Sequence, residues 1–166
     1  MTAGTQIQIE VFLADYRDAA QAAAVVDLLD AYASEPAGGG VPLDPAVRQD
    51  LPAALAARPQ AFSVLAFEGG QPVGLVNCLE GFSTFACKPL VNVHDVVVLP
   101  SHRGQGVAQK MFARVEQEAR RRGACKLTLE VLSNNKPALR TYEREGFASY
   151  QLDPEFGHAV FLQKKL

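Results

Sequence analysis

Cysteine is scarce in this chain, cations are not in excess, and long apolar runs are absent. The chain holds 16 Lys and Arg against 18 Asp and Glu, so its formal net charge is −2. A nucleic-acid-binding domain usually carries a basic excess, so this balance predicts no nucleic-acid partner. An odd number of cysteines without metal-site spacing predicts reduced thiols that are buried as small hydrophobic residues. They are Cys78, Cys87 and Cys125.

Membrane and export signals are lacking as well. No apolar run approaches the roughly 18 residues that identify a membrane span, which predicts no membrane partner. The N-terminal residues include Glu10 and Asp15 and show no succession of basic, apolar and small residues. We therefore expect a cytoplasmic protein without a secretory signal. The histidines lack ligand spacing and predict no metal site. They are His94, His102 and His158.

The remaining composition is that of a globular protein. A length of 166 residues with 48% hydrophobic residues predicts a single domain, residues 1–166. Hydrophobic periodicity predicts an α/β fold with a mixed, mostly antiparallel sheet of six or seven strands and helices on both faces. The expected strands are residues 6–13, 61–67, 72–79, 91–99, 126–132, 147–152 and 159–163, the last two as a hairpin. The expected helices are residues 19–32, 45–58, 105–122 and a short one between Asn135 and Gly146.

Residues at the expected helix ends support these boundaries. Asp15 and Asp44 are predicted N-caps, and Pro45 suits a first helical position. The run Arg120–Arg122 lies at the end of the long helix, where cations interact favourably with the helix dipole. We expect this role at the helix end rather than a contact with nucleic acid.

The stretch from Val93 to Gln109 is the most informative feature of the chain. A β-branched run, Val96–Leu99, ends at Pro100 and predicts a strand followed by a turn. Gly104 and Gly106 then open a helix, where the first amides have no intrahelical partner and glycine lets a ligand approach the backbone. This arrangement predicts a cradle for a pyrophosphate, with Arg103 adding a fixed positive charge.

Two common nucleotide motifs fit this stretch poorly. A P-loop requires Lys and then Ser or Thr after its last glycine, whereas Val107 and Ala108 follow Gly106. The dinucleotide fingerprint requires a third small residue where this chain has Gln109. The alternative without a ligand is a plain strand–turn–helix with capping glycines.

A second motif favours one family. The two motifs are Arg103-x-x-Gly106-x-Ala108 and Asn135-x-x-Ala138-x-x-x-Tyr142-x-x-x-Gly146-Phe147. In this order and separation they resemble the GNAT N-acetyltransferase superfamily, most sharply from Val93 to Phe147. The resemblance implies acetyl-CoA as co-substrate, a primary amine as acceptor, and the corresponding acyl-CoA N-acyltransferase fold.

The resemblance also implies where acetyl-CoA binds. The pantetheine arm would lie between the strands 93–99 and 126–132, because an unpaired strand edge offers backbone groups to an amide-bearing ligand. Asn135 would bond the arm from the other side. The implied contacts are Val96, Val98, Arg103, Gly104, Gln105, Gly106, Val107, Ala108, Asn135, Ala138 and Tyr142.

The implied chemistry needs an acid and a base. Tyr142 matches the superfamily's general acid, since a phenol is protonated at neutral pH and can serve a departing thiolate. The base stays open between Glu130, Asp95 and His94. Strand alternation places His94 and Asp95 on opposite faces unless a bulge intervenes. Each of the three also has a purely structural alternative.

The acceptor is expected to enter between two segments, Ser34–Leu43 and Gly81–Leu90. The first is rich in glycine and proline, as lid loops often are. The second contains Phe82, Phe85 and Lys88, which predict a small acceptor with an apolar or carboxylate-bearing part. The alternative is that both phenylalanines pack in the core.

Three functions remain open at this stage. The leading hypothesis is acetylation of a small-molecule amine by direct attack in a ternary complex. The alternatives are acetylation of a protein N-terminus or lysine, and a non-catalytic acyl-CoA-binding sensor; the presence of both Glu130 and Tyr142 favours catalysis. Apolar residues of the terminal hairpin indicate a homodimer: Phe156, Val160 and Phe161.

Overall fold

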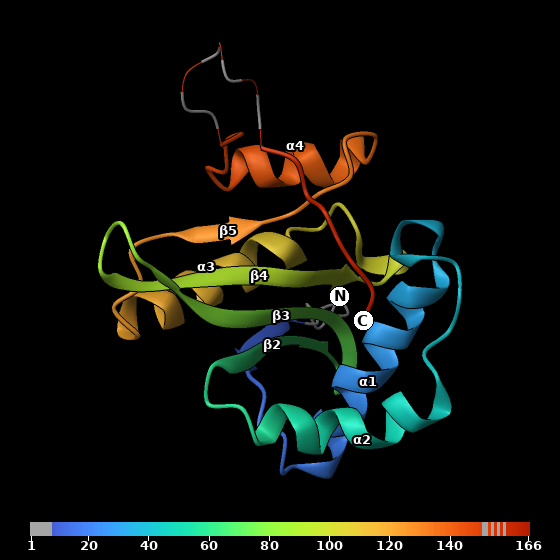
Figure 1. Ribbon diagram of the computed structural model, residues 1–166. Coiled ribbons are helices and arrows are strands. Elements are labelled where there is room, and N and C mark those ends of the chain that lie inside the picture. Colours follow the sequence, from blue (N-terminus) through green and yellow to red (C-terminus); the bar gives the residue numbers. More distant parts are fainter. Residues whose placement is uncertain (1–7, 151–152, 154, 156, 158) are drawn as a thin grey trace. The chain divides into compact units, whose positions relative to one another are not determined.

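Five strands form one mixed sheet in the order β1-β2-β3-β4-β5 (Figure 1). The strands are β1 (Ile9–Leu13), β2 (Ala61–Glu68), β3 (Gln71–Ser83), β4 (Lys88–Val98) and β5 (Leu127–Leu129). The first four pair antiparallel, and β5 runs parallel to β4. The computed structural model describes residues 8–150, 153, 155, 157 and 159–166. The chain forms two compact units, Met1–Leu129 and Glu130–Leu166.

Four α-helices accompany the sheet in the described residues. They are α1 (Ala19–Ser34), α2 (Pro45–Ala56), α3 (Val107–Arg121) and α4 (Lys136–Arg144), with two 3₁₀ turns, η1 (Pro36–Gly38) and η2 (Pro100–His102). Asp44 caps α2 as predicted, by accepting from the Ala46 amide, and Pro45 takes the first position. Asp15 does not cap α1. Asp18 does so instead, because its side chain reaches the Gln21 amide at 2.9 Å. No helix in the described ranges is long and apolar enough to cross a membrane.

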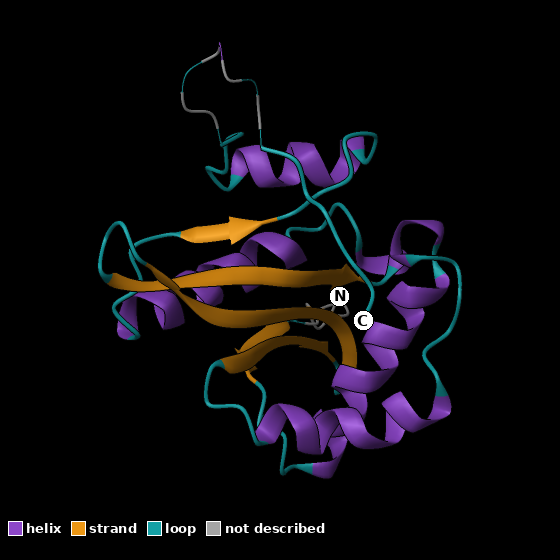
Figure 2. Cartoon of the chain, viewed as in Figure 1, coloured by secondary structure: helices purple, strands orange, loops and turns teal. Residues whose placement is uncertain are grey.

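Helices cover both faces of the sheet (Figure 2). On one face, Val25 and Leu28 of α1 pack in a buried cluster with Leu75 of β3. On the other face, α3 crosses so closely that a Cβ at Gly74 would lie 2.9 Å from the Cε atom of Met111. Since neighbouring strand residues point to opposite faces, α1 and α3 must lie on opposite sides of β3. We call these the α1 face and the α3 face.

The predicted strand number is wrong. Residues 147–150 and 159–163, expected as a terminal hairpin, form no strand, and residues 151–152 lie outside the described residues. The expected strand 126–132 is reduced to β5, Leu127–Leu129. The segment Gly81–Leu90, expected as a connection, largely extends β3 and β4 into a long hairpin. An alternating pattern of apolar and polar residues predicts a strand, but the strand forms only where a partner strand is available to pair with it.

The C-terminal unit, Glu130–Leu166, contains α4. Asn135 caps this helix by accepting from the Ala138 amide at 3.3 Å. Gly146 follows the helix with a positive φ of 86°, which agrees with the predicted helix end. Within this unit the ring of Tyr142 meets Phe147 edge-on, with ring centroids 6.0 Å apart.

Candidate active site

A β-bulge interrupts β4 at His94. Asn77 pairs with Asp95 and the next residue, Cys78, pairs with Val93, so His94 is the extra residue of β4. The bulge reverses the alternation that a regular strand would impose. Asp95 shares the α1 face with Asn77 and Val97 by regular alternation, whereas the extra residue moves Val93 to the α3 face. His94 is exposed, and its Nδ1 atom lies 3.4 Å from Asn92 Oδ1.

Asp95 is held by a chain of polar side chains that crosses three strands. Asn77 donates from Nδ2 to Asp95 Oδ2 at 3.0 Å. Ser63 of β2 donates from Oγ to Asn77 Oδ1 at 2.6 Å, and the Tyr16 hydroxyl lies 2.8 Å from Ser63 Oγ. Ser63 is 1% exposed and Asn77 8% exposed. The sequence analysis missed all three residues, although a serine and an asparagine inside apolar strands were a usable signal.

Tyr32 of α1 brings a further hydroxyl to this face. It packs against the cluster that contains Val97, two residues from Asp95 on β4. Burial raises the pKa of Tyr32, and the negative charges of Asp95 and Glu35 raise it further. Asp95 thus lies near a phenol whose raised pKa keeps it protonated at neutral pH.

The glycine cradle has the predicted geometry. Gly104 and Gly106 adopt positive φ values of 74° and 77°, and Gly106 is the N-cap of α3 without a side-chain cap. The first-turn amides of α3 therefore have no partner within the helix. A Cβ at Gly104 would meet nothing within 4 Å, and one at Gly106 would meet only Gln109 Oε1 at 4.0 Å. Backbone conformation, rather than crowding, requires glycine at both positions.

The Arg103 guanidinium makes hydrogen bonds to two other residues of the N-terminal unit. Its Nε atom donates to the carbonyl oxygen of Val98 at 2.9 Å, and Nη2 donates to Glu35 Oε1 at 2.6 Å. These contacts join the turn that precedes the cradle to the end of β4 and to the residue that follows α1. The guanidinium that was predicted to contact phosphate thus also holds the turn in shape.

The edge of β4 beyond the bulge faces away from β3. The Leu99 amide donates to the Val73 carbonyl at 3.0 Å, so alternation turns the amide and carbonyl of Val98 and Val96 to the opposite side. In the described residues, β5 covers that side of β4 only along Val91–Val93. The two residues predicted to contact pantetheine therefore present backbone groups along an edge that leads to the cradle.

Four predicted site residues belong to the C-terminal unit. Glu130 is exposed and directly follows β5. Asn135, Ala138 and Tyr142 are partly buried and come from α4 and its cap. Ala138 and Tyr142 are four residues apart and therefore lie on one face of the helix.

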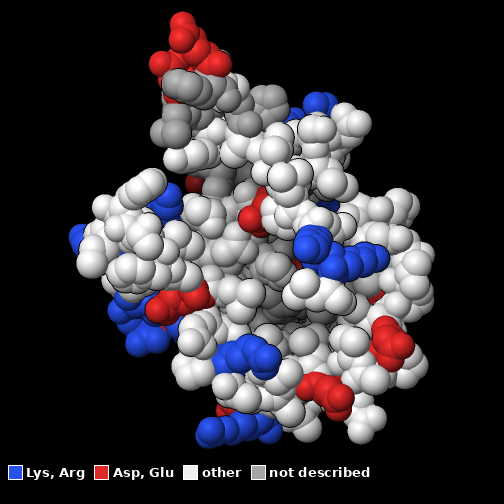
Figure 3. Space-filling model, viewed as in Figure 1, with Lys and Arg blue, Asp and Glu red and all other residues white. Residues whose placement is uncertain are grey.

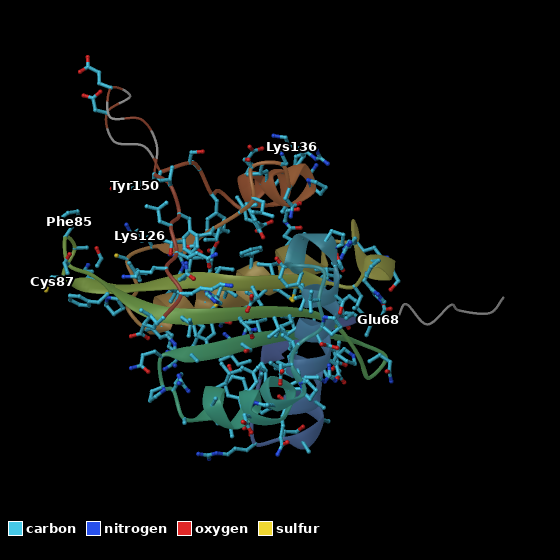
Figure 4. The ribbon with its side chains drawn as sticks, turned by 45° about the vertical axis from the view of Figure 1, so that its right-hand side comes forward. Glu68, Phe85, Cys87, Lys126, Lys136 and Tyr150 are labelled. Atoms are coloured by element: carbon cyan, nitrogen blue, oxygen red, sulfur yellow. The ribbon has the colours of Figure 1, made fainter. Side chains whose placement is uncertain are left out.

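The two segments predicted to admit the acceptor lie at opposite ends of β4. Glu35, at the start of Ser34–Leu43, binds the cradle turn, whereas Phe85 and Cys87 lie at the far tip of the β3–β4 hairpin (Figure 4). Phe82 and Phe85 are 59% and 100% exposed, so the alternative that they pack in the core is wrong. Lys88 precedes Asp95 by seven positions, which is on the order of 20 Å along a strand.

The surface charge of the N-terminal unit is mixed. On the face drawn in Figure 3, acidic and basic side chains are interspersed over its helices and sheet. This distribution agrees with the near-neutral net charge of −2.

Two of the three cysteines differ from expectation. Cys78 is buried, and burial raises the pKa of its thiol to about 12, so it behaves as a small hydrophobic residue. Cys87 and Cys125 are exposed, which corrects the expectation of burial. Cys87 occupies the hairpin turn with a positive φ of 49°, a conformation that few residues other than glycine adopt.

A family comparison covers most of the chain. A sequence model described as "Acetyltransferase (GNAT) family" matches residues 23–147, which is 125 of the 166 residues. The match extends from α1 through the cradle to the end of the second motif.

Curated relatives match over shorter stretches. Streptothricin acetyltransferase of Streptomyces lavendulae is 38% identical over 84 residues, 49% of this chain and 44% of that protein. Aminoalkylphosphonate N-acetyltransferase of Salmonella typhimurium is 32% identical over 83 residues, 50% of this chain and 54% of that protein. The chain thus spans about half the length of the curated relatives it matches.

Solved structures share the fold. A probable acetyltransferase superposes with a TM-score of 0.77 at 21% identity, covering 95% of this chain and 99% of the other. An aminoglycoside N-acetyltransferase in complex with CoA gives a TM-score of 0.75 at 14% identity, covering 99% of this chain and 100% of the other. At these identities the likeness concerns the fold alone.

Proposed function

Because the chain belongs to the acetyltransferase (GNAT) family, we propose that it transfers an acetyl group from acetyl-CoA to the primary amine of a small molecule. The hydrogen bond from Asn77 carries this proposal, since it fixes the Asp95 carboxylate on the α1 face beside the exposed edge of β4. The same strand continues into the glycine cradle at Gly104 and Gly106. One strand thus combines a candidate base with a candidate binding edge for the donor.

The residues of the N-terminal unit fit acetyl-CoA. Two glycines with positive φ and the uncapped start of α3 direct backbone amides outward, which suits a pyrophosphate. The outward backbone groups of Val96 and the outward amide of Val98, whose carbonyl accepts from Arg103, suit the amides of a pantetheine arm. We assign the cradle contacts to Arg103, Gly104, Gln105, Gly106, Val107 and Ala108. From the second family motif we add Asn135 and Ala138.

Amine acetylation forms a nitrogen–carbon bond and breaks the carbon–sulfur bond of the thioester. The acceptor ammonium must first lose a proton, and the departing thiolate gains one. Among the three candidate bases Asp95 has the best support, because Asn77 fixes one of its oxygens, whereas His94 and Glu130 are exposed. Tyr142 remains our proposal for the acid, from its place in the second motif.

The negative charge of Asp95 favours a cationic acceptor. The Asp95 carboxylate would attract an incoming ammonium on the α1 face, whereas the charge of Glu35 is offset by its ion pair with Arg103. The relatives named as acetyltransferases of streptothricin and of aminoalkylphosphonate support a small-molecule amine as the acceptor. Acetylation of a protein amine and acyl-CoA sensing without turnover are the alternatives.

The test is thiol release from acetyl-CoA across a panel of polyamines, amino acids, aminoglycosides and short peptides, with mass spectrometry of the products. We expect stoichiometric CoA and a small-molecule product heavier by one acetyl group. Preference for longer peptides would move the acceptor class to proteins. Acetyl-CoA binding without turnover on any amine would favour the sensor.

Three variants distinguish the candidate bases by their kinetics: Asp95→Asn, Glu130→Gln and His94→Gln. Each replacement preserves much of the side-chain shape and removes the ability to accept the amine proton at neutral pH. We expect the Asp95 variant to lose kcat by roughly 10²-fold or more, with acetyl-CoA affinity unchanged. A larger loss in either of the other variants would transfer the role to that residue.

A further inference from the structure

The hydrogen bonds in the polar chain that ends at Asp95 are all donated in the same direction, toward the carboxylate. Ser63 donates its hydroxyl proton to Asn77 Oδ1, which can only accept. The Tyr16 hydroxyl, 2.8 Å from Ser63 Oγ, must then be the donor of that contact. Asn77 in turn donates from Nδ2 to Asp95 Oδ2. Every proton in the chain therefore points toward the carboxylate.

The direction depends on which way the Asn77 amide is turned. The opposite orientation would set its oxygen against a carboxylate oxygen, which repels unless Asp95 is protonated. The orientation present is the one compatible with an ionised Asp95. Burial raises the pKa of Tyr16, which keeps its hydroxyl proton available for donation.

The two oxygens of Asp95 have different surroundings. Oδ2 accepts from Asn77, whereas no partner for Oδ1 is found among the described residues. No buried side-chain oxygen or nitrogen of those residues lacks a partner, so Oδ1 is accessible to solvent. One oxygen is anchored from within the protein, and the other is available to an incoming group.

We propose that Asn77, supported by Ser63 and Tyr16, is the positioning residue that fixes the orientation of the Asp95 carboxylate. The hydrogen-bond chain from Tyr16 to Asp95 conducts no proton. This inference rests on the proposed function. The Asn77 amide donates to Asp95 but offers no basic site through which a proton could pass onward. A proton taken from the acceptor ammonium by Oδ1 therefore leaves to solvent and not through Tyr16.

Titratable groups from α1, β3 and β4 lie near Asp95. Tyr32 from α1 and Cys78 from β3 both have raised pKa values, that of Cys78 being about 12. Glu35 is paired with Arg103. His94 is the neighbour of Asp95 on β4, so any test must control for it.

The test compares kcat, KM and pH profiles of the full chain carrying Asn77→Leu or Asn77→Asp. Both variants keep the approximate side-chain volume, and the aspartate retains an acceptor for Ser63. We expect kcat to fall about 10-fold or more at neutral pH, with unchanged acetyl-CoA affinity. The acidic limb of the kcat/KM profile should move to higher pH, because leucine removes a donor and aspartate adds a like charge. The shift should persist with His94→Gln.

Tyr16→Phe separates positioning from proton conduction. It leaves the Ser63–Asn77 and Asn77–Asp95 hydrogen bonds in place, so we expect a far smaller loss than in the Asn77 variants. A loss as large as theirs would overturn the claim that no proton passes. An equal loss of activity at every pH in both Asn77 variants would overturn the positioning role.

Failure of the inference and failure of the proposed function give different results. If the wild type acetylates amines while the Asn77 variants keep its profile, only the inference is wrong. If the wild type binds acetyl-CoA and acetylates nothing, both are wrong. The amine panel with the wild type is therefore run first.

Discussion

Arg103 and Glu35 form an ion pair of 2.6 Å that joins the turn before the cradle to the residue after α1. The two residues are 68 positions apart in the sequence. Arg103 is half exposed and Glu35 is 31% exposed, so the pair is partly screened by solvent. A carboxylate beside the cradle would compete with a pyrophosphate for the same guanidinium.

Glu35→Gln should tighten acetyl-CoA binding. The substitution releases Arg103 from a competing charge, and a pair this exposed is worth at most about 1 kcal/mol, or roughly fivefold in affinity. Calorimetry at low salt would measure the gain, which should shrink as salt rises. Weaker binding would mean that the pair chiefly holds the turn in shape.

Gly106→Ala should lower acetyl-CoA affinity and stability together. The positive φ of 77° costs an alanine about 1–2 kcal/mol, and relief of that strain would move the first amides of α3. The matched control is Gly123→Ala, which has a φ of 74° at the other end of α3 and open space around its Cβ. Both variants should unfold at lower urea concentration, and only Gly106→Ala should bind acetyl-CoA less well. Equal affinities would contradict the cradle.

Tyr142→Phe should lower kcat by roughly 10²-fold if its hydroxyl protonates the leaving thiolate. The change keeps the ring and therefore its edge contact with Phe147. The control is Tyr150→Phe in the same unit, where the side chain is 60% exposed. An unchanged kcat would remove Tyr142 from the mechanism. Steady-state kinetics at saturating acetyl-CoA would decide this.

Phe85→Ala combined with Lys88→Ala should separate a small acceptor from an extended one. A small amine at Asp95 would lie on the order of 20 Å from this hairpin tip, so its KM should not change. A peptide acceptor long enough to reach the tip would lose affinity. Because Phe85 is fully exposed, the variant should keep wild-type stability. A raised KM for a small amine would place the acceptor site at the hairpin.

Glu118 should make stability depend on acid pH. Its side chain is 1% exposed and accepts from Arg121 and Arg122, whose hydrogen bonds, against the opposing effect of burial, lower its pKa from 4.5 to about 2. A depressed carboxyl pKa stabilises the fold above about 4.5, and this stabilisation is lost as pH falls toward 2. Urea unfolding at pH 7 and pH 3 should show the loss, and Glu118→Gln should reduce it.

Arg122→Ala should destabilise the protein by about 1.5–3 kcal/mol, since it removes one hydrogen bond from a buried carboxylate that Arg121 still pairs. Arg122 also donates to Glu80 Oε2 at 3.0 Å and lies 4.6 Å above the Phe62 ring centroid. Arg120→Ala is the control, because that side chain is 79% exposed. Similar losses in both variants would contradict this network.

Features that depend on a few neighbouring residues were predictable from the sequence. The Asp44 cap, the helix end at Gly146 and the left-handed glycines of the cradle follow from backbone preferences that act within one turn. The long helix α3 was predicted from its apolar stripe. Family membership depended on such local motifs and agrees with the match over residues 23–147.

Features that depend on pairing between distant segments were decided by the tertiary structure. The bulge at His94 follows from the register of β4 on β3, and the chain from Tyr16 to Asp95 joins residues that are 14, 18 and 47 positions apart. Strand pattern alone showed neither that register nor the missing terminal strands, because alternation marks two faces without naming a partner. The sequence by itself determined the cradle and the family. Only the sheet decided which carboxylate is anchored, because a hydrogen bond requires two groups to meet in space.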